Sequence, residues 1–202
     1  MKKIMFKDKY GLTQAVLDGR KTMTRRLVPQ KVINNSKVYA QLGQRGGNIN
    51  DARIEYIVHQ SPYKIGEVVA IAQSYRKIEK EIEKEGYPLD LKREKRICAG
   101  YTNKMFVRAE DMPHHIKITN IRVEHLQDIS DEDCLREGVR LWEDVDPEYK
   151  LNPLGKLYEI AGRWDGYKSP REAFAALIDK VSGKGTWESN PLVWVYKFEL
   201  VN

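Results

Sequence analysis

The spacing of apolar and polar positions predicts several β-strands along the chain. Apolar and β-branched residues dominate the strand candidates, which are residues 1–6, 22–28, 67–72, 115–125 and 192–201. Within 115–125 the alternation shifts by one residue after Ile118, which predicts a bulge near Thr119 and Asn120. The last candidate is apolar on both sides, so we expect both of its faces to be covered.

Helical periodicity and capping residues predict helices between these strands. The candidates are residues 12–18 before Gly19, residues 76–86, a short segment from Ser130 to Gly138, and a long segment from Ser169 to Gly183. Ser130 has Asp133 three positions on, and Ser169-Pro170-Arg171-Glu172 is a full capping box. The apolar stripe of the long helix predicts a face buried in the core, formed by Phe174, Leu177, Ile178 and Val181.

The other segments carry weaker signals. Residues 34–50 are rich in Asn and Gly and predict a loop, within which 37–42 could form a short hairpin arm, and residues 53–59 predict another strand. Residues 140–168 are rich in Pro, Gly and aromatic residues and predict an excursion over the surface. Because no repeat and no clear linker divides the chain, we expect a single α+β domain spanning residues 1–202.

Composition is that of an ordinary globular protein. The 202 residues are 41% hydrophobic and 32% charged, which is enough apolar material for one core. No apolar run is long enough to cross a bilayer or to act as a signal peptide, so we expect a cytoplasmic protein with no membrane partner. The two cysteines, Cys98 and Cys134, form no Cys-x-x-Cys motif and are expected to be reduced thiols.

Positive charge is concentrated at the start of the chain. The net charge is +6, and residues 1–31 hold nine Lys or Arg against two Asp. A basic cluster on a near-neutral body is typical of a face that binds polyanions, because phosphate contacts need local cations. Charge alone is equally compatible with a terminus that only improves solubility.

The segment Gly19–Arg26 packs four cations and two hydroxyls into eight residues. On a strand, Thr24 and Arg26 would share one face and Arg25 would lie on the other. Three interpretations are open: a strand that contacts phosphates, an active centre with an amine beside a hydroxyl nucleophile, or a charged edge strand that discourages aggregation. Residue types alone favour the third.

Motifs in four separate segments resemble the ASCH family, whose β-barrel is similar to the PUA RNA-binding barrel. They are Gly-Arg-Lys-Thr-x-Thr-x-Arg at 19–26, Lys-Ile-Gly-Glu-Val at 64–68, Glu137-Gly138 after a strand, and the ending Asn-Pro-Leu-Val-Trp-Val-Tyr at 190–196. Together with the run at 123–130, they look closest to the longer ASCH proteins of phages and prophages. The similar segments cover 70 of the 202 positions. The resemblance implies a small PUA-like β-barrel flanked by helices, with insertions at 29–60, 76–104 and 140–168.

The resemblance also implies a site. In a similar bacterial branch the activity is amide hydrolysis of an acetylated cytidine nucleoside, and the matching positions make Lys21 the catalytic lysine, Thr24 the nucleophile and Glu137 the acid/base or electrostatic support. Burial or neighbouring arginines would have to lower the pKa of the lysine for it to act as a base. The residues expected to bind ligand or nucleic acid around this trio are Arg20, Arg25, Arg26 and Trp194.

The sequence is therefore compatible with three functions. The first is a module that binds RNA or a modified nucleotide, because Lys, Arg, Thr and Glu can hold phosphates and base edges without breaking a bond. The second is an amidohydrolase that deacylates a modified nucleobase or nucleoside such as acetylcytidine. The third is a phage assembly or interaction protein. No cofactor is expected, and the four histidines match no spacing of metal ligands.

Overall fold

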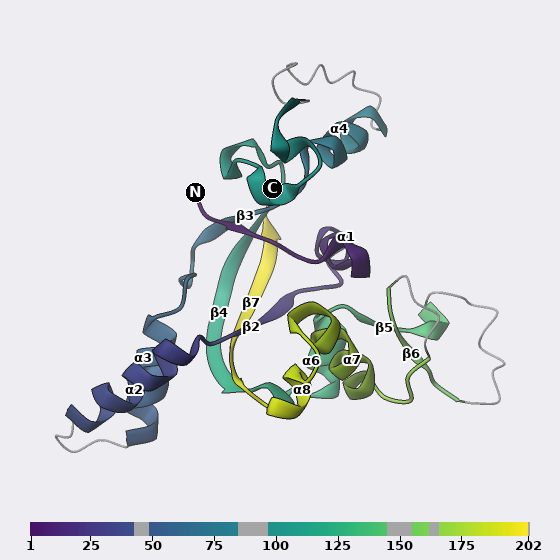
Figure 1. Cartoon of the computed structure of the whole chain (residues 1–202). Coiled ribbons are helices and arrows are strands. Elements are labelled where there is room, and N and C mark those ends of the chain that lie inside the picture. Colours follow the sequence, from purple (N-terminus) through teal and green to yellow (C-terminus); the bar gives the residue numbers. More distant parts are fainter. Residues whose placement is uncertain (43–48, 85–96, 145–154, 162–165, 202) are drawn as a thin grey trace.

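A five-stranded sheet forms the centre of the computed structural model, which describes residues 1–42, 49–84, 97–144, 155–161 and 166–201. The strand order is β1-β3-β4-β7-β2 (Figure 1). Strand β1 pairs with β3 in parallel, and every other pair is antiparallel. The strands are β1 (Lys3–Ile4), β2 (Met23–Leu27), β3 (Val68–Ile71), β4 (His115–His125) and β7 (Leu192–Val201).

The longest pairing, between β4 and β7, contains the predicted bulge. It runs from His115 opposite Val201 to His125 opposite Leu192, and its register shifts between Ile118 and Asn120, where the bulge is predicted. The segment Val193–Tyr196 is buried throughout, so both faces of β7 are covered there as predicted, whereas Glu199 and Leu200 near its end are exposed.

Helices pack near the β2 edge of the sheet (Figure 1). They are α1 (Leu12–Leu17), α6 (Asp131–Arg136), α7 (Pro170–Ser182) and α8 (Thr186–Ser189), and α6 contacts both α7 and β2. The predicted N-caps are confirmed, because Ser130 Oγ accepts a hydrogen bond from the amide of Asp133 and Ser169 Oγ accepts one from the amide of Glu172. None of the helices in the described residues is long and apolar enough to cross a membrane.

Residues 30–42 and 49–59 form a pair of helices, so the predictions of a hairpin arm at 37–42 and a strand at 53–59 are wrong. The loop predicted at 34–50 is wrong for 34–42 and 49–50, and residues 43–48 lie outside the described residues. Helix α2 (Gln30–Leu42) packs against α3 (Ile49–His59) through the small buried residues Ser36 and Ala40, and the rings of Tyr39 and Tyr56 lie 5.0 Å apart. This packing overrides the β-propensity of the Ile, Tyr and Val residues in α3.

Two further segments complete the fold. Helix α4 (Tyr75–Lys84) confirms the described part of the helix predicted at 76–86, and it buries Tyr75 and Ile78 in a cluster with residues of the turns η2 (Ala99–Tyr101) and η4 (Ala109–Asp111). The turn η3 (Lys104–Phe106) lies between these two in sequence. Within 140–168, β5 (Val139–Leu141) pairs with β6 (Tyr158–Ile160), with the turn η6 (Trp142–Asp144) between, while 145–154 and 162–165 lie outside the described residues. Trp142 and Ile160 are buried, so this segment is more than a surface excursion.

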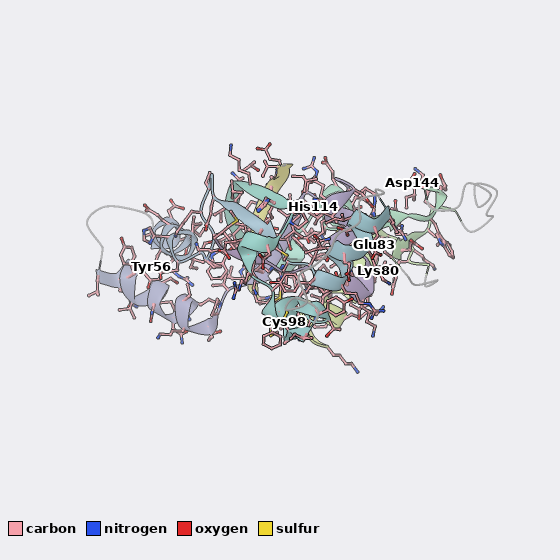
Figure 2. The ribbon with its side chains drawn as sticks, turned by 90° about the horizontal axis from the view of Figure 1, so that it is seen from above. Tyr56, Lys80, Glu83, Cys98, His114 and Asp144 are labelled. Carbon is pink, nitrogen blue, oxygen red and sulfur yellow. The ribbon has the colours of Figure 1, made fainter. Side chains whose placement is uncertain are left out.

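Seen from above, the α2–α3 pair and the β5–β6 segment lie at opposite ends of the molecule, marked by Tyr56 and Asp144 (Figure 2). Two further short turns are η1 (Asp8–Tyr10), which precedes α1, and η5 (Leu126–Asp128), which follows β4.

The α+β class is confirmed, but the described strands form an open sheet rather than a closed barrel. Its edges are β1 and β2. A side chain joins them, because Arg26 Nη2 on β2 donates a 2.6 Å hydrogen bond to the carbonyl of Met5, one residue after β1. The space beside these two edges holds the site described next.

Trp194 ties the α2–α3 pair to the sheet. Its buried indole N–H donates a 2.8 Å hydrogen bond to the carbonyl of Ile57.

We predict that Trp194→Phe lowers the free energy of unfolding by about 1–3 kcal/mol in urea titrations, because the carbonyl loses its buried partner. The control Tyr39→Phe, on an exposed ring, should change it by less than about 0.5 kcal/mol. Equal stability of Trp194→Phe and the wild type would contradict this role.

Candidate functional site

A cavity of about 390 Å³ lies where β2, α7 and the chain after β1 meet. Its polar lining comes from the start of β2 and the end of α6, and its apolar lining comes mainly from α7 and from Phe6 and Leu12. The polar lining includes Lys21, Thr24, Arg25, Arg26 and Glu137. Turn η3 contributes Lys104 and Met105, and Asn103 precedes it.

The amine, hydroxyl and carboxylate expected from the family resemblance line this one cavity. Lys21 Nζ donates to Glu137 Oε2 at 2.6 Å and to the Glu137 carbonyl at 2.8 Å. Thr24 is 4% exposed and Lys21 is 2% exposed. Within the described part of the chain, the Thr24 hydroxyl has no hydrogen-bond partner, so it is available to a ligand.

Two glycines bring these groups together. Gly19 has a φ of 72°, and the turn that it makes lets the Lys21 amide bond to the carbonyl of Ala15 at 2.8 Å, which fixes Lys21 at the entry to β2. Gly138 has a φ of 107° directly after Glu137, and a Cβ there would lie 3.0 Å from Leu12 Cδ2. The turns predicted at Gly19 and Gly138 therefore position Lys21 and Glu137 in the site.

Arg25 holds the carboxylate of Glu137 from the other side. Its fully buried side chain places Nη1 3.1 Å from Glu137 Oε1, and Nη2 2.6 Å from Glu124 Oε1 and 3.1 Å from Asp133 Oδ2. Arg122 closes the ring, with Nε 2.7 Å from Glu124 Oε2 and Nη2 2.6 Å from Asp133 Oδ2. We call these five residues the Arg25 network. Arg25, expected to bind ligand, is thus held by three protein carboxylates.

Of the other residues expected to bind a ligand, Arg26 lines the cavity, whereas Arg20 and Trp194 do not. Arg26 lines the cavity, and its guanidinium carbon lies 5.7 Å from the centroid of the Phe6 ring. Arg20 is exposed, pairs with Asp18 at 2.9 Å and does not line the cavity. Trp194 does not line it either, because its indole is packed beside α3. Most of the basic segment is therefore engaged with the protein itself.

Burial sets the protonation behaviour of the trio. Desolvation lowers the pKa of Lys21 below its ordinary value of 10.5, the charges of Arg26 and Arg25 lower it further, and Glu137 only partly offsets them. Burial would raise the pKa of Asp133, but hydrogen bonds from Arg122 and Arg25 outweigh it and hold that pKa below its ordinary value. The site thus makes Lys21 lose its proton more readily than a lysine in water, and it makes Asp133 a stronger acid.

Sequence reasoning missed the network and the apolar wall. The sequence predicts for Asp133 only a place in the cap of α6, and Glu124 is 99 positions from Arg25 in sequence. For the apolar stripe of α7 the sequence predicts only burial in the core. The Asp133 carboxylate pairs with Arg25 and Arg122 instead of the backbone of its own helix, and nothing in the local sequence indicates this pairing. Only the structure identifies the members of the network.

No metal site is evident in the part of the chain that the structure describes, where no three His, Cys, Asp or Glu side chains are grouped to hold an ion. Comparisons of the chain with models of protein families, with curated proteins and with solved structures found no match. The resemblance to the ASCH family therefore stays a prediction, and the cavity is interpreted from its own chemistry.

We predict that Arg25→Leu destabilises the protein by about 3–5 kcal/mol at neutral pH, because it removes the buried counter-ion that three carboxylates share. The folded pKa of Asp133 is lowered, so its ion pairs stabilise the wild type above its unfolded pKa and lose this effect as pH falls through the folded pKa. The deficit of the variant should therefore shrink in acid.

Urea titrations at neutral and acidic pH measure this difference. Arg20→Leu is the matched control, because it removes an exposed pair worth at most about 1 kcal/mol. A deficit for Arg25→Leu no larger than that of Arg20→Leu, or one that grows in acid, would rule out the network as a stabilising element.

Proposed function

We propose that the cavity binds a modified nucleobase or nucleoside and hydrolyses an amide bond in it. The observation that carries this proposal is the meeting of a buried lysine with a lowered pKa, its carboxylate partner at 2.6 Å and an unpaired threonine hydroxyl in one small cavity. Nucleophilic catalysis by a hydroxyl needs a base beside it and a group that stabilises the charged base once formed.

The residues fit a two-step acyl transfer. In the first step Thr24 Oγ attacks the amide carbon, and its proton passes through one bridging water to the Lys21 amine in its uncharged form. Glu137 stabilises the resulting ammonium. The C–N bond then breaks as Lys21 returns the proton to the leaving nitrogen, which departs as the free amine. Water hydrolyses the Thr24 ester in the second step, releasing the carboxylic acid and restoring the hydroxyl.

The size and charge of the cavity favour a small ligand over a long polynucleotide. About 390 Å³ is at the lower end of the roughly 300–1,000 Å³ typical of small-molecule pockets. Arg25 is taken up by carboxylates and Arg20 by Asp18, so two of the cations expected to contact phosphates are already paired.

Binding of a modified nucleotide without hydrolysis is the second candidate. It is favoured by Lys7 and Arg26, which place two cations in the lining where a phosphate attached to a bound nucleoside would be stabilised. In that case the Lys21–Glu137 pair and Thr24 would hydrogen-bond the base without reacting. Both candidates use the same cavity, and product formation distinguishes them.

We predict that the wild type releases cytidine from N4-acetylcytidine. Thr24→Val should lower kcat/KM by at least about 100-fold, because it removes the hydroxyl nucleophile while keeping the shape of the side chain. Lys21→Met and Glu137→Gln should lower it similarly. Lys37→Met, on the exposed side of α2, is the matched control and should retain wild-type turnover. Saturable binding by the wild type with no cytidine release would favour the binding function over hydrolysis.

The pH dependence of turnover tests the role of Lys21. Since only the uncharged amine accepts a proton, kcat/KM should rise with pH and level off, with its inflection below the ordinary lysine value of 10.5. In Glu137→Gln the remaining activity should show an inflection at still lower pH, because the carboxylate is the group that raises the pKa of Lys21. A profile that falls as pH rises towards 10.5 would exclude Lys21 as the base.

A further inference from the structure

The α7 side of the cavity is an apolar wall. Phe174, Leu177, Ile178 and Val181 occur at helical spacing on one face of α7, and all four line the cavity. The wall begins close to the polar groups: the guanidinium carbon of Arg25 lies 6.0 Å from the centroid of the Phe174 ring. A stripe that the sequence assigns to the core therefore also forms a ligand-facing surface.

This wall is held in place by both ends of its helix. Ser169 caps the start of α7, and at the other end Asp179 accepts hydrogen bonds from the amides of Gly185 and Trp187. The rings of Phe174 and Trp187 also meet edge to face, with centroids 6.2 Å apart. The apolar surface is thus preorganised and needs no rearrangement to receive an apolar group.

The two sides of the cavity differ in chemistry. Arg26 and Asn103 provide donors suited to a polar nucleobase, whereas the α7 wall offers no polar side chain between Phe174 and Val181 along its lining. The Lys104 ammonium is already hydrogen-bonded to Phe6, Asp8 and Thr13. An acetyl group is small and would cover little of such a wall. A longer aliphatic chain would bury its methylene groups there, and burial of each CH₂ is favourable.

We propose that the α7 wall is an acyl-binding compartment and that the preferred substrates are amides of medium-length aliphatic acids, such as butyryl and hexanoyl amides, rather than acetyl amides. This inference rests on the proposed hydrolase function for its catalytic readout. The bond that breaks is the same amide C–N bond, water is the co-reactant, and the products are the aliphatic acid and the free nucleobase amine.

An acyl series tests the compartment. For N4-acetyl-, N4-butyryl- and N4-hexanoylcytidine, kcat/KM should rise by about threefold to fourfold for each added CH₂ that the wall covers. Val181→Phe, at a half-buried position near the end of α7, should reduce the hexanoyl-to-acetyl ratio of kcat/KM by about tenfold or more by filling the compartment. Val38→Trp, on exposed α2, is the control and should keep the wild-type ratio.

Leu177→Ala provides a second variant in the opposite direction, because it enlarges the compartment and should shift the preference to longer chains. Turnover that is highest for acetylcytidine and falls with chain length would overturn this inference while the proposed function stands. If no amide is hydrolysed, calorimetric binding of the same three compounds decides: tighter binding of the hexanoyl compound supports the compartment, and equal or absent binding overturns it.

Discussion

The ion pair between Lys21 and Glu137 is the interaction on which the rest of the structure depends. Removing an ammonium and a carboxylate from water costs several kcal/mol per ion, and a single partner repays this cost only with excellent geometry and further hydrogen bonds. Here Glu137 is shared, because one oxygen meets Lys21 and the other meets Arg25. The Arg25 network extends the compensation to Glu124 and Asp133, and so joins β2, β4 and α6.

The same arrangement has a chemical consequence. A carboxylate that paired with Lys21 alone would raise the pKa of the lysine strongly. Glu137 also pairs with Arg25, and the positive charge of Arg25 lowers the pKa of Lys21. Burial in a partly apolar cavity then lowers the pKa of the amine. In the proposed hydrolase, the network that stabilises the fold would also prepare Lys21 to act as a base, with the Thr24 hydroxyl and the apolar wall of α7 in the same cavity.

Local signals in the sequence were enough to predict much of the fold. Ser130 and Ser169 cap their helices, and the bulge of β4 lies where the alternation changes phase, because each feature depends on residues a few positions apart. The helix α3 could not be predicted this way, since it is rich in β-branched residues and its contacts with α2 and Trp194 lie outside the segment. A closed barrel was expected, and the described strands form an open sheet.

The site was predictable in its central residues but not in its supporting ones. Lys21 and Thr24 lie in one short motif, whereas the partners of Arg25 come from positions about a hundred residues away, and charge alone does not reveal pairing.

The most direct test of the account is an NMR titration of the Lys21 side-chain amine in the intact protein. The account predicts a pKa below 10.5, and a value at or above 10.5 would contradict it.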